Sequence, residues 1–200
     1  MNSQRSYTQT ARAEAVVATR ARIVDAAHEL FLQHAYEDVT LAAIAKAASV
    51  SHQTVLNHFE SKEGVARAVA AVLEADTFAA RDQARPGDAT NIVHVVVGEY
   101  EKTGDANARW ALTSGRLGTL AELIDDARTS HQRWLERMFG EHLPDDRGRR
   151  RRAVNALHAA TDVYTWKLLR RDLGLSRAEA ERTMVVLVAG VLDQCQGEMT

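Results

Sequence analysis

Two short helical patterns, separated by a break, occupy residues 40–59. Their apolar positions are Ile44, Ala45, Ala48, Val50, Val55 and Phe59. Spacings of three and four residues place such side chains on one helical face. Ser51 follows the break and is a good N-cap for the second helix, whose remaining positions are mostly polar. The pattern predicts two helices joined by a tight turn.

The flanking segments are also helical in pattern. Before the pair, residues 19–39 form an amphipathic segment. Its apolar stripe consists of Ile23, Ala26, Ala27, Leu30 and Phe31. After the pair, Ser61 is placed to cap a helix from Lys62 to about Gln83, with Glu63 in its first turn. The Pro-Gly stretch at 85–88 then predicts a domain boundary, because such residues punctuate helices.

The second half of the chain again has the pattern of helices. We expect about five of them, bounded by Gly and Pro positions. Their predicted spans are 89–102, 105–116, 118–141, 146–173 and 176–196. Gly174 suits the residue after a helix end, and Ser176 with Glu179 makes a capping box for the last helix. No sustained strand-like alternation occurs, so we predict an all-α chain of about nine helices in total.

The spacing in residues 40–59 is that of a helix-turn-helix, although any αα-hairpin with a short turn has a similar pattern. Together with its flanks, the stretch from 19 to about 75 resembles the DNA-binding domain of the TetR family of bacterial transcriptional regulators. The resemblance is carried by Arg22, Ile23, Ala26, Ala27, Leu30, Phe31, Tyr36, Thr40, Ile44, Ala45, Ala48, Val50, Ser51, Thr54, Val55, His58, Phe59, Ser61, Lys62 and Glu63.

The resemblance implies a domain organisation. Residues 1–18 would be a flexible N-terminal arm, and 19–85 a three-helix DNA-binding domain with a connecting fourth helix. Residues 86–200 would be a helical domain for ligand binding and dimerisation. The family often has Gly where Ser49 stands, but Ser tolerates many turn conformations when no positive φ is needed, so we expect the turn to form. The family commonly has Tyr at Leu56, where a hydroxyl contact to phosphate is therefore missing.

The polar face of the second helix supplies candidate DNA contacts. We expect His52, Gln53 and Asn57 at base edges, since Asn and Gln suit adenine and the last two lie one turn apart. Phosphate contacts are expected where polar side chains stand at helix starts or at family positions that touch the backbone. These are Thr40, Ser51, Thr54, His58 and Lys62. The plain alternative for each is a solvated polar residue, and His58 is equally suited to pack beside Phe59.

Charge does not by itself indicate a DNA-binding protein. The formal net charge is −2, and within residues 1–67 the basic and acidic side chains balance. Convergence of a few positive groups and helix N-termini on one face remains sufficient for phosphate binding. The lone Cys195 and the absence of a signal-peptide pattern or a long apolar run favour a cytoplasmic protein without a membrane span.

A candidate effector pocket lies among the C-terminal helices, where His131 interrupts an apolar stripe. Small-molecule sites are largely apolar with a few polar groups. The candidate lining residues are His94, Trp110, His131, Trp134, Met138, His158 and Tyr164. A histidine in such a stripe is more often a satisfied core residue. The histidines are scattered without ligand spacing, so we expect no metal and no cofactor.

The last predicted helix is too broadly apolar for one buried stripe, so we expect it to pair with its own copy in a homodimer. The candidate interface residues are Val154, Leu157, Leu168, Val185, Val188 and Leu192. An ordinary internal helix of a monomer core is the alternative.

The function that follows is a ligand-responsive transcriptional repressor. It would bind a near-palindromic operator as a dimer and be released by a small, largely apolar effector. The alternatives are a helical protein-interaction module without sequence-specific DNA binding, or an all-α enzyme. The chain has no Gly-rich phosphate loop and no nucleophile motif, which argues against the enzyme.

Overall fold

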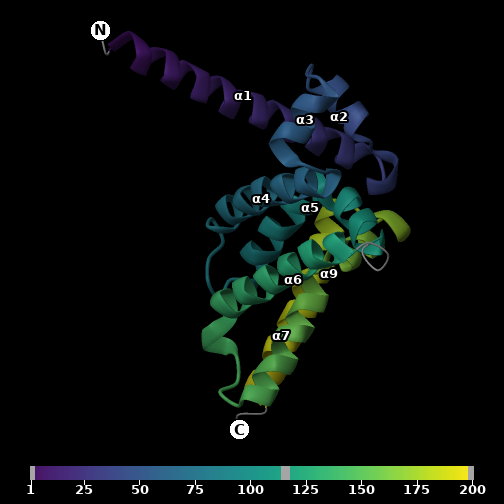
Figure 1. Ribbon diagram of the computed structural model, residues 1–200. Helices are drawn as coiled ribbons and strands as arrows, with labels where there is room; N and C mark the ends of the chain where they lie inside the picture. The colour runs from purple at the N-terminus through teal and green to yellow at the C-terminus, as the bar shows by residue number, and fades with distance from the viewer. Residues whose placement is uncertain (1–2, 114–117, 198–200) are drawn as a thin grey trace. The chain divides into compact units, whose positions relative to one another are not determined.

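The computed structural model describes residues 3–113 and 118–197, and every regular element in these ranges is helical (Figure 1). This confirms the all-α prediction. The chain divides into two compact units, Met1–Leu73 and Glu74–Thr200. The Pro-Gly stretch at 85–88, where the sequence predicts a domain boundary, lies within the second unit. None of the described helices has both the length and the apolar composition needed to cross a membrane.

The first unit is built from three helices and the start of a fourth. In order they are α1 Ser3–Gln33, the 3-10 turn η1 Tyr36–Asp38, α2 Leu41–Ala47, α3 His52–Phe59 and the first part of α4 Lys62–Arg81. The predicted apolar positions form its core. Among them, Ile23, Ala27, Phe31, Ile44, Ala45, Ala48, Val55 and Phe59 are all buried. The predicted N-caps Ser51 and Ser61 are confirmed, because each accepts a backbone N–H three residues later.

The N-terminal segment differs from the prediction. Residues 3–18, expected as a flexible arm, are the first turns of α1. Figure 1 shows this part of α1 projecting past α2 and α3 of its own unit. A physical reason is available in the sequence, since residues 3–33 contain neither Gly nor Pro and are rich in Ala, the strongest helix former. The exposed Val16 and Val17 lie on this extension.

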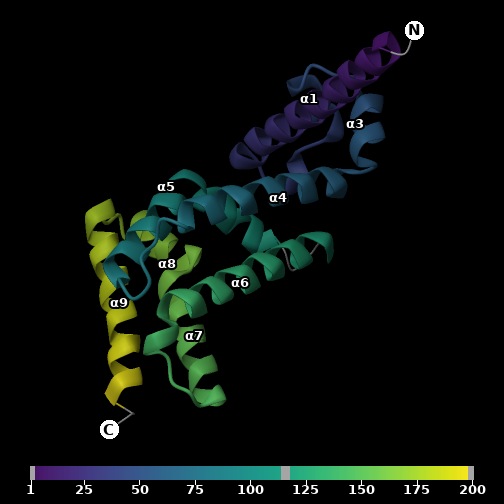
Figure 2. The same cartoon turned by 90° about the vertical axis from the view of Figure 1, so that its left-hand side faces the viewer.

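The second unit contains the end of α4 and the remaining helices. These are α5 Ala89–Thr113, α6 Gly118–Phe139, η3 Gly140–His142, α7 Arg147–Thr161, α8 Val163–Lys167, the π-helical η4 Leu168–Asp172 and α9 Arg177–Gly197. Helix α5 is the central element, since it packs against α6, α8 and α9, while α7 packs against α6 and α9 (Figure 2). The core includes Val96, Trp134, Leu157, Trp166 and Met184.

Two predicted helix boundaries in this unit are wrong. The predicted break at 103–104 does not occur, because α5 runs through Gly104. Any Cβ at Gly104 would overlap the ring of Trp166, so this glycine permits close packing rather than ending a helix. Conversely, the predicted helix 146–173 is interrupted at Asp162, whose carboxylate accepts the N–H of Tyr164 at 2.8 Å and begins α8. The last residues of the predicted helix 105–116 lie outside the described residues.

The boundary before α9 is confirmed in detail. Gly174 has φ of 67°, the left-handed conformation that suits a residue after a helix end. Ser176 N–H donates to Glu179 Oε2 at 2.9 Å, and Glu179 N–H donates back to Ser176 Oγ at 3.3 Å. This reciprocal pair is the predicted capping box.

Candidate nucleic-acid interface

The turn between α2 and α3 forms with a strained residue. Thr40 begins α2, with its Oγ1 accepting the N–H of Ala43 at 3.1 Å. At the turn, Ser49 has φ of 55°. The turn forms as expected from the sequence, but the condition attached to that expectation is not met, since Ser49 holds a conformation that favours Gly and costs other residues about 1–2 kcal/mol. The packing of Ile44 and Val55, both fully buried, outweighs that penalty.

The outer face of α3 presents three exposed polar side chains, those of His52, Gln53 and Asn57. Gln53 Nε2 donates to Asn57 Oδ1 at 2.9 Å. The two amides are thus held side by side one turn apart, which lowers the entropy lost when they bind a common partner. The bond leaves Gln53 with its carbonyl oxygen and Asn57 with both amide hydrogens, so the pair presents an acceptor and donors together.

The candidate phosphate contacts at the helix starts already serve as caps. Ser51 Oγ accepts the N–H of Thr54 at 3.0 Å and lies 2.8 Å from the Thr54 hydroxyl. Ser51 and Thr40 are exposed, and Thr54 is half-buried. A phosphate oxygen only accepts, so a hydroxyl must give it its single hydrogen. The bond between Ser51 and Thr54 uses one of their two hydrogens, which leaves one for a phosphate, and Thr40 accepts the N–H of Ala43 without using its own.

Lys62 is held mainly by its own unit. Its Nζ donates to the carbonyl oxygens of Tyr36 at 2.7 Å and Val39 at 2.8 Å, and lies 4.1 Å from the centroid of the Tyr36 ring. Burial lowers the pKa of Lys62 from its ordinary value, partly offset by Glu63. Two of its three N–H groups are therefore used to tie the start of α4 to η1. His58 and Leu56 are half-buried on α3, and the His58 ring is tilted beside Phe59 at 6.1 Å.

Two further residues position α3 and were not predicted as such. Glu60, which ends α3, has φ of 64°. Gly64 lies directly against the carbonyl of Phe59, where any Cβ would overlap the backbone. The close approach of α4 to the end of α3 requires a glycine at this position. The sequence signal was a glycine inside a helix, which carries a propensity penalty and therefore often has a packing reason.

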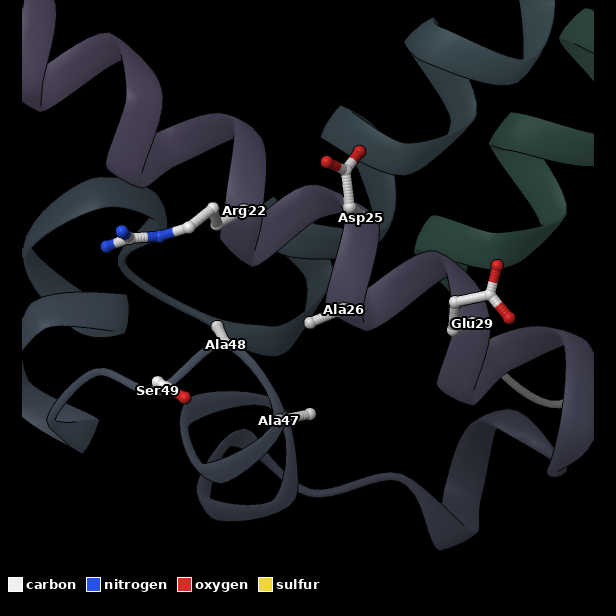
Figure 3. Close-up of a pocket in the computed structure, with 7 residues that line it drawn as sticks. All are labelled: Arg22, Asp25, Ala26, Glu29, Ala47, Ala48 and Ser49. Atoms are coloured by element: carbon white, nitrogen blue, oxygen red, sulfur yellow. The ribbon is translucent and has the colours of Figure 1, made fainter.

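A shallow hollow lies between α1 and the turn that follows α2. Figure 3 shows Ala26 of α1 across from Ala47 and Ala48, with the carboxylates of Asp25 and Glu29 pointing away from these methyl groups. Arg22 and Ser49 complete its lining. The hollow is a place where small residues let two helices approach, and the charged groups at its edge point to solvent rather than into it.

In the second unit, a chain of hydrogen bonds runs through His131. Arg81, at the end of α4, donates from Nη1 to His131 Nδ1 at 3.0 Å and from Nε to Glu99 at 3.0 Å. His131 Nε2 lies 2.9 Å from the hydroxyl of Thr161, which itself donates to the carbonyl of Leu157 at 2.8 Å. Burial, with the nearby Arg81 and His158, holds the pKa of His131 well below its usual range. Arg81, Glu99 and Thr161 were not predicted.

The structure brings together only some of the predicted pocket residues. Trp134 stacks on His131 with ring centroids 5.8 Å apart. The ring of His158 also contacts that of His131, edge-on, with centroids 5.0 Å apart. Met138 lies in the same core. His94 instead lies at the surface, 3.3 Å from Glu181, and Tyr164 is exposed. Trp110 is half-buried near the end of α5. Within the described ranges, no group of three His, Cys, Asp or Glu residues is arranged to hold a metal ion.

Most of the predicted dimer-interface residues lie inside a single chain. Val154, Leu157, Val188 and Leu192 belong to the core of the second unit. Val185 is half-buried, and Leu168 is 49% exposed. The apolar residues that α9 leaves at the surface are Val186, 70% exposed, and Leu187, 43% exposed. An interface formed by α9 therefore has these side chains available, not the buried ones.

The first unit is similar in sequence to known regulatory proteins. A family model described as bacterial regulatory proteins of the tetR family matches residues 23–69. The HTH-type transcriptional regulator UidR of Escherichia coli strain K12 is 37% identical over 51 residues, which is 26% of this chain and 26% of UidR. The UidR of Shigella flexneri matches to the same extent. The aligned region thus spans about a quarter of the length of these relatives.

Solved structures share the fold over most of the chain. A tetR-family transcriptional regulator from Streptomyces coelicolor has a TM-score of 0.73 at 18% identity, covering 90% of this chain and 83% of its own. Salmonella enterica GusR has a TM-score of 0.71 at 18% identity, covering 88% and 96%. Residues 23–69 therefore match the DNA-binding part of the tetR family of bacterial regulatory proteins, and most of the chain shares its fold with solved regulators of that family.

Proposed function

We propose that this chain is a DNA-binding transcriptional regulator that reads its operator with α3. The observation that carries the proposal is the exposed pair of amides, Gln53 and Asn57, joined at 2.9 Å on the outer face of a helix whose inner face is buried. Such a pair suits bidentate recognition of adenine at neighbouring base pairs. His52 lies on the same exposed face. Phosphate contacts then set the position of α3 along the duplex, and they are made by Thr40, Ser51, Thr54, His58 and Lys62.

The regulator acts as a homodimer and as a repressor released by a small effector. Two copies place two recognition helices on successive major-groove faces, about 34–36 Å apart, so the operator is nearly palindromic. An effector bound in the second unit shifts this arrangement only by its differential affinity for the two states, typically ~1–3 kcal/mol. UidR is named an HTH-type transcriptional regulator and the Streptomyces coelicolor structure a tetR-family transcriptional regulator, which supports this proposal over an enzyme or a protein-interaction module.

The test is selection of bound sequences from random duplex DNA by the purified protein. We expect an enriched near-palindrome. The double variant Gln53→Ala, Asn57→Ala should enrich no sequence. A matched control exists in the other unit, where Gln132 and Asn155 form the same kind of pair at 3.5 Å; Gln132→Ala, Asn155→Ala should recover the wild-type sequence. Failure of the wild-type protein to enrich any sequence at low salt would overturn the proposal.

The dimer is tested separately by solution mass. Val186→Asp with Leu187→Asp places two charges on the exposed apolar face of α9, and we expect it to give a monomer. The matched control is Val16→Asp with Val17→Asp, which changes two exposed valines of α1 and should remain a dimer. If the α9 variant stays dimeric, another surface joins the copies.

A further inference from the structure

The positive charge of the first unit is concentrated in the sequence that begins α1. Residues 1–20 carry three arginines and one glutamate, a net side-chain charge of +2. Residues 21–67, which include α2 and α3, carry four basic and six acidic side chains, a net side-chain charge of −2. Duplex DNA is a dense polyanion, and proteins that bind it place positive groups against its phosphates. The start of α1 is therefore the part of this unit whose charge complements DNA best.

Two of these arginines lie on one face of α1 with a valine between them. Arg12, Val16 and Arg20 are spaced by four residues, so their side chains follow one line along the helix. We call these three residues the basic strip. All three are exposed. The acidic Glu14 is two residues away from both Arg12 and Val16, which places it on the opposite face of the helix. The strip therefore presents positive charge without an acidic neighbour on its own face.

The basic strip continues the face with which α1 packs on its own unit. Val16 precedes the buried Ile23 by seven residues, and Arg20 precedes the buried Val24 by four, so the strip and the core stripe point to the same side of α1. Where they join, the Arg20 guanidinium lies 4.9 Å from the ring centroid of Phe59, the last residue of α3. The strip thus begins at the end of α3 and follows the part of α1 that projects beyond α3 (Figure 1).

These features favour a phosphate backbone over a protein surface as the partner of the strip. A single valine offers little apolar area, whereas a stable protein interface has an apolar core. A guanidinium suits phosphate because it donates two parallel hydrogen bonds in its plane, and stacking on an aromatic ring does not use those donors. Arg12 and Arg20 are eight residues apart, about 12 Å along the helix axis, so they reach different phosphates.

We propose that the basic strip binds the phosphate backbone of the operator, beside the base pairs that α3 reads. This inference rests on the proposed function and adds a second contact surface to it. An operator is much longer than the eight residues of α3, so its backbone continues beyond that helix. The contact carries no sequence information and raises the affinity for all duplexes alike, whereas Gln53 and Asn57 set the preference for one. The helix holds Arg12 at a fixed distance from α3, which lowers the entropy lost on binding.

The experiment measures the affinity of the full-length protein for the selected duplex and a scrambled duplex over a range of salt concentrations. Arg12→Gln with Arg20→Gln should weaken both by the same factor, about tenfold or more at low salt. The slope of log affinity against log salt should fall by about two for each bound copy, and the ratio of the two affinities should not change. Arg12→Lys with Arg20→Lys keeps both charges and should retain the slope.

A charge-matched control lies in the second unit. Arg133→Gln with Arg137→Gln removes two exposed arginines from one face of α6 and should leave both affinities and the slope unchanged. If Arg20→Gln disturbs the fold through its contact with Phe59, Arg12→Gln alone should lower the slope by about one.

A further pair of variants tests whether the helix positions Arg12. Ala15→Pro keeps every charge but breaks the helix between Arg12 and the rest of the unit, so we expect the slope to fall by about one. Ala15→Gln, at the same exposed position, introduces a good helix former and should keep the wild-type slope. A wild-type slope in Ala15→Pro would overturn the role given to the helix.

The inference is overturned if Arg12→Gln with Arg20→Gln binds both duplexes as the wild type does, or if it changes the ratio of their affinities. A smaller solution mass of this variant without DNA would also overturn it, because the strip would then join two copies of the chain. Failure of the proposed function gives a different result, since the wild-type protein itself would then select no duplex.

Discussion

The two units of this protein differ in the burial of the hydrogen-bonded side chains on which their proposed roles rest. In the first, the amides of Gln53 and Asn57 are paired on an exposed face above a mainly apolar core. In the second, Arg81, His131 and Thr161 are buried and bonded in series. Outward-facing groups suit a large polar partner such as DNA, whereas inward-facing groups suit a small molecule or the fold itself. Under the proposed function, recognition and regulation therefore belong to different parts of the chain.

The largest change in stability is expected at Gly104, which lets α5 pack against Trp166 in the second unit. Gly104→Val would force side-chain atoms into that ring, and we expect the free energy of unfolding to fall by about 3 kcal/mol. Denaturant titration measures it. Gly190→Val in α9 is the control, since its added side chain meets nothing within 4 Å and should change stability little. Equal effects of the two variants would contradict the packing argument.

In the first unit, Lys62→Met is expected to have the next largest effect. It removes two hydrogen bonds from an ammonium group to the carbonyls of Tyr36 and Val39, so we expect a loss of about 2 kcal/mol in the free energy of unfolding. Lys46→Met, at an exposed position of α2, should change it by less than ~0.5 kcal/mol. The slope of log affinity for DNA against log salt should also fall by about one if Lys62 contacts a phosphate. An unchanged slope would restrict Lys62 to its structural role.

Acid should destabilise the second unit through His131. Its folded-state pKa lies well below the ordinary value, so below pH ~6.5 the unfolded chain binds a proton that the folded chain does not. Stability is therefore complete above that pH and is lost as the pH falls. Between pH 6.5 and 5 we expect the wild type to lose about 1–2 kcal/mol more than His131→Gln. His34 is exposed directly after the end of α1, and His34→Gln should lose as much stability over this pH range as the wild type. If His131→Gln lost more stability than the wild type between pH 6.5 and 5, the folded-state pKa of His131 would not be lowered.

The smallest change in the free energy of unfolding is expected at Ser49, in the first unit. Ser49→Gly relieves a positive φ of 55°, and we expect it to raise the free energy of unfolding by about 1 kcal/mol. Ser49→Ala keeps the backbone penalty and should bring no such gain. Thermal unfolding of the two variants measures the difference. A gain in both would mean that the Ser side chain, not the backbone, carries the cost.

The sequence predicted the first unit better than the second for a physical reason. The helix-turn-helix depends on contacts between residues close in sequence, so periodicity and caps such as Ser51 identify it directly. The sequence pattern did not reveal the positive φ of Ser49, because that φ depends on how α2 and α3 pack. In the second unit, Gly104 suggested a break because its partner Trp166 is distant in sequence. Arg81 was missed for the same reason, since fifty residues separate it from His131.

The predicted dimer interface shows that an apolar run in the sequence does not identify the surface that covers it. The run of apolar residues in α9 was read as a surface for a second copy, but Val188 and Leu192 are used by the core of the same chain. A pattern identifies which residues avoid water and not which neighbour covers them. The exposed Val186 and Leu187 could be told apart from the buried ones only with α5 and α7 in place.

The central claim is that Gln53 and Asn57 of α3 read sequence. The most direct measurement is the ratio of affinities for the selected duplex and a scrambled duplex, determined at one salt concentration for the wild type and for Gln53→Ala, Asn57→Ala. Each bidentate contact contributes ~1–3 kcal/mol of discrimination, so we expect the ratio to fall by about a hundredfold or more while affinity for scrambled DNA is retained. A ratio that is unchanged in the double variant would contradict the account.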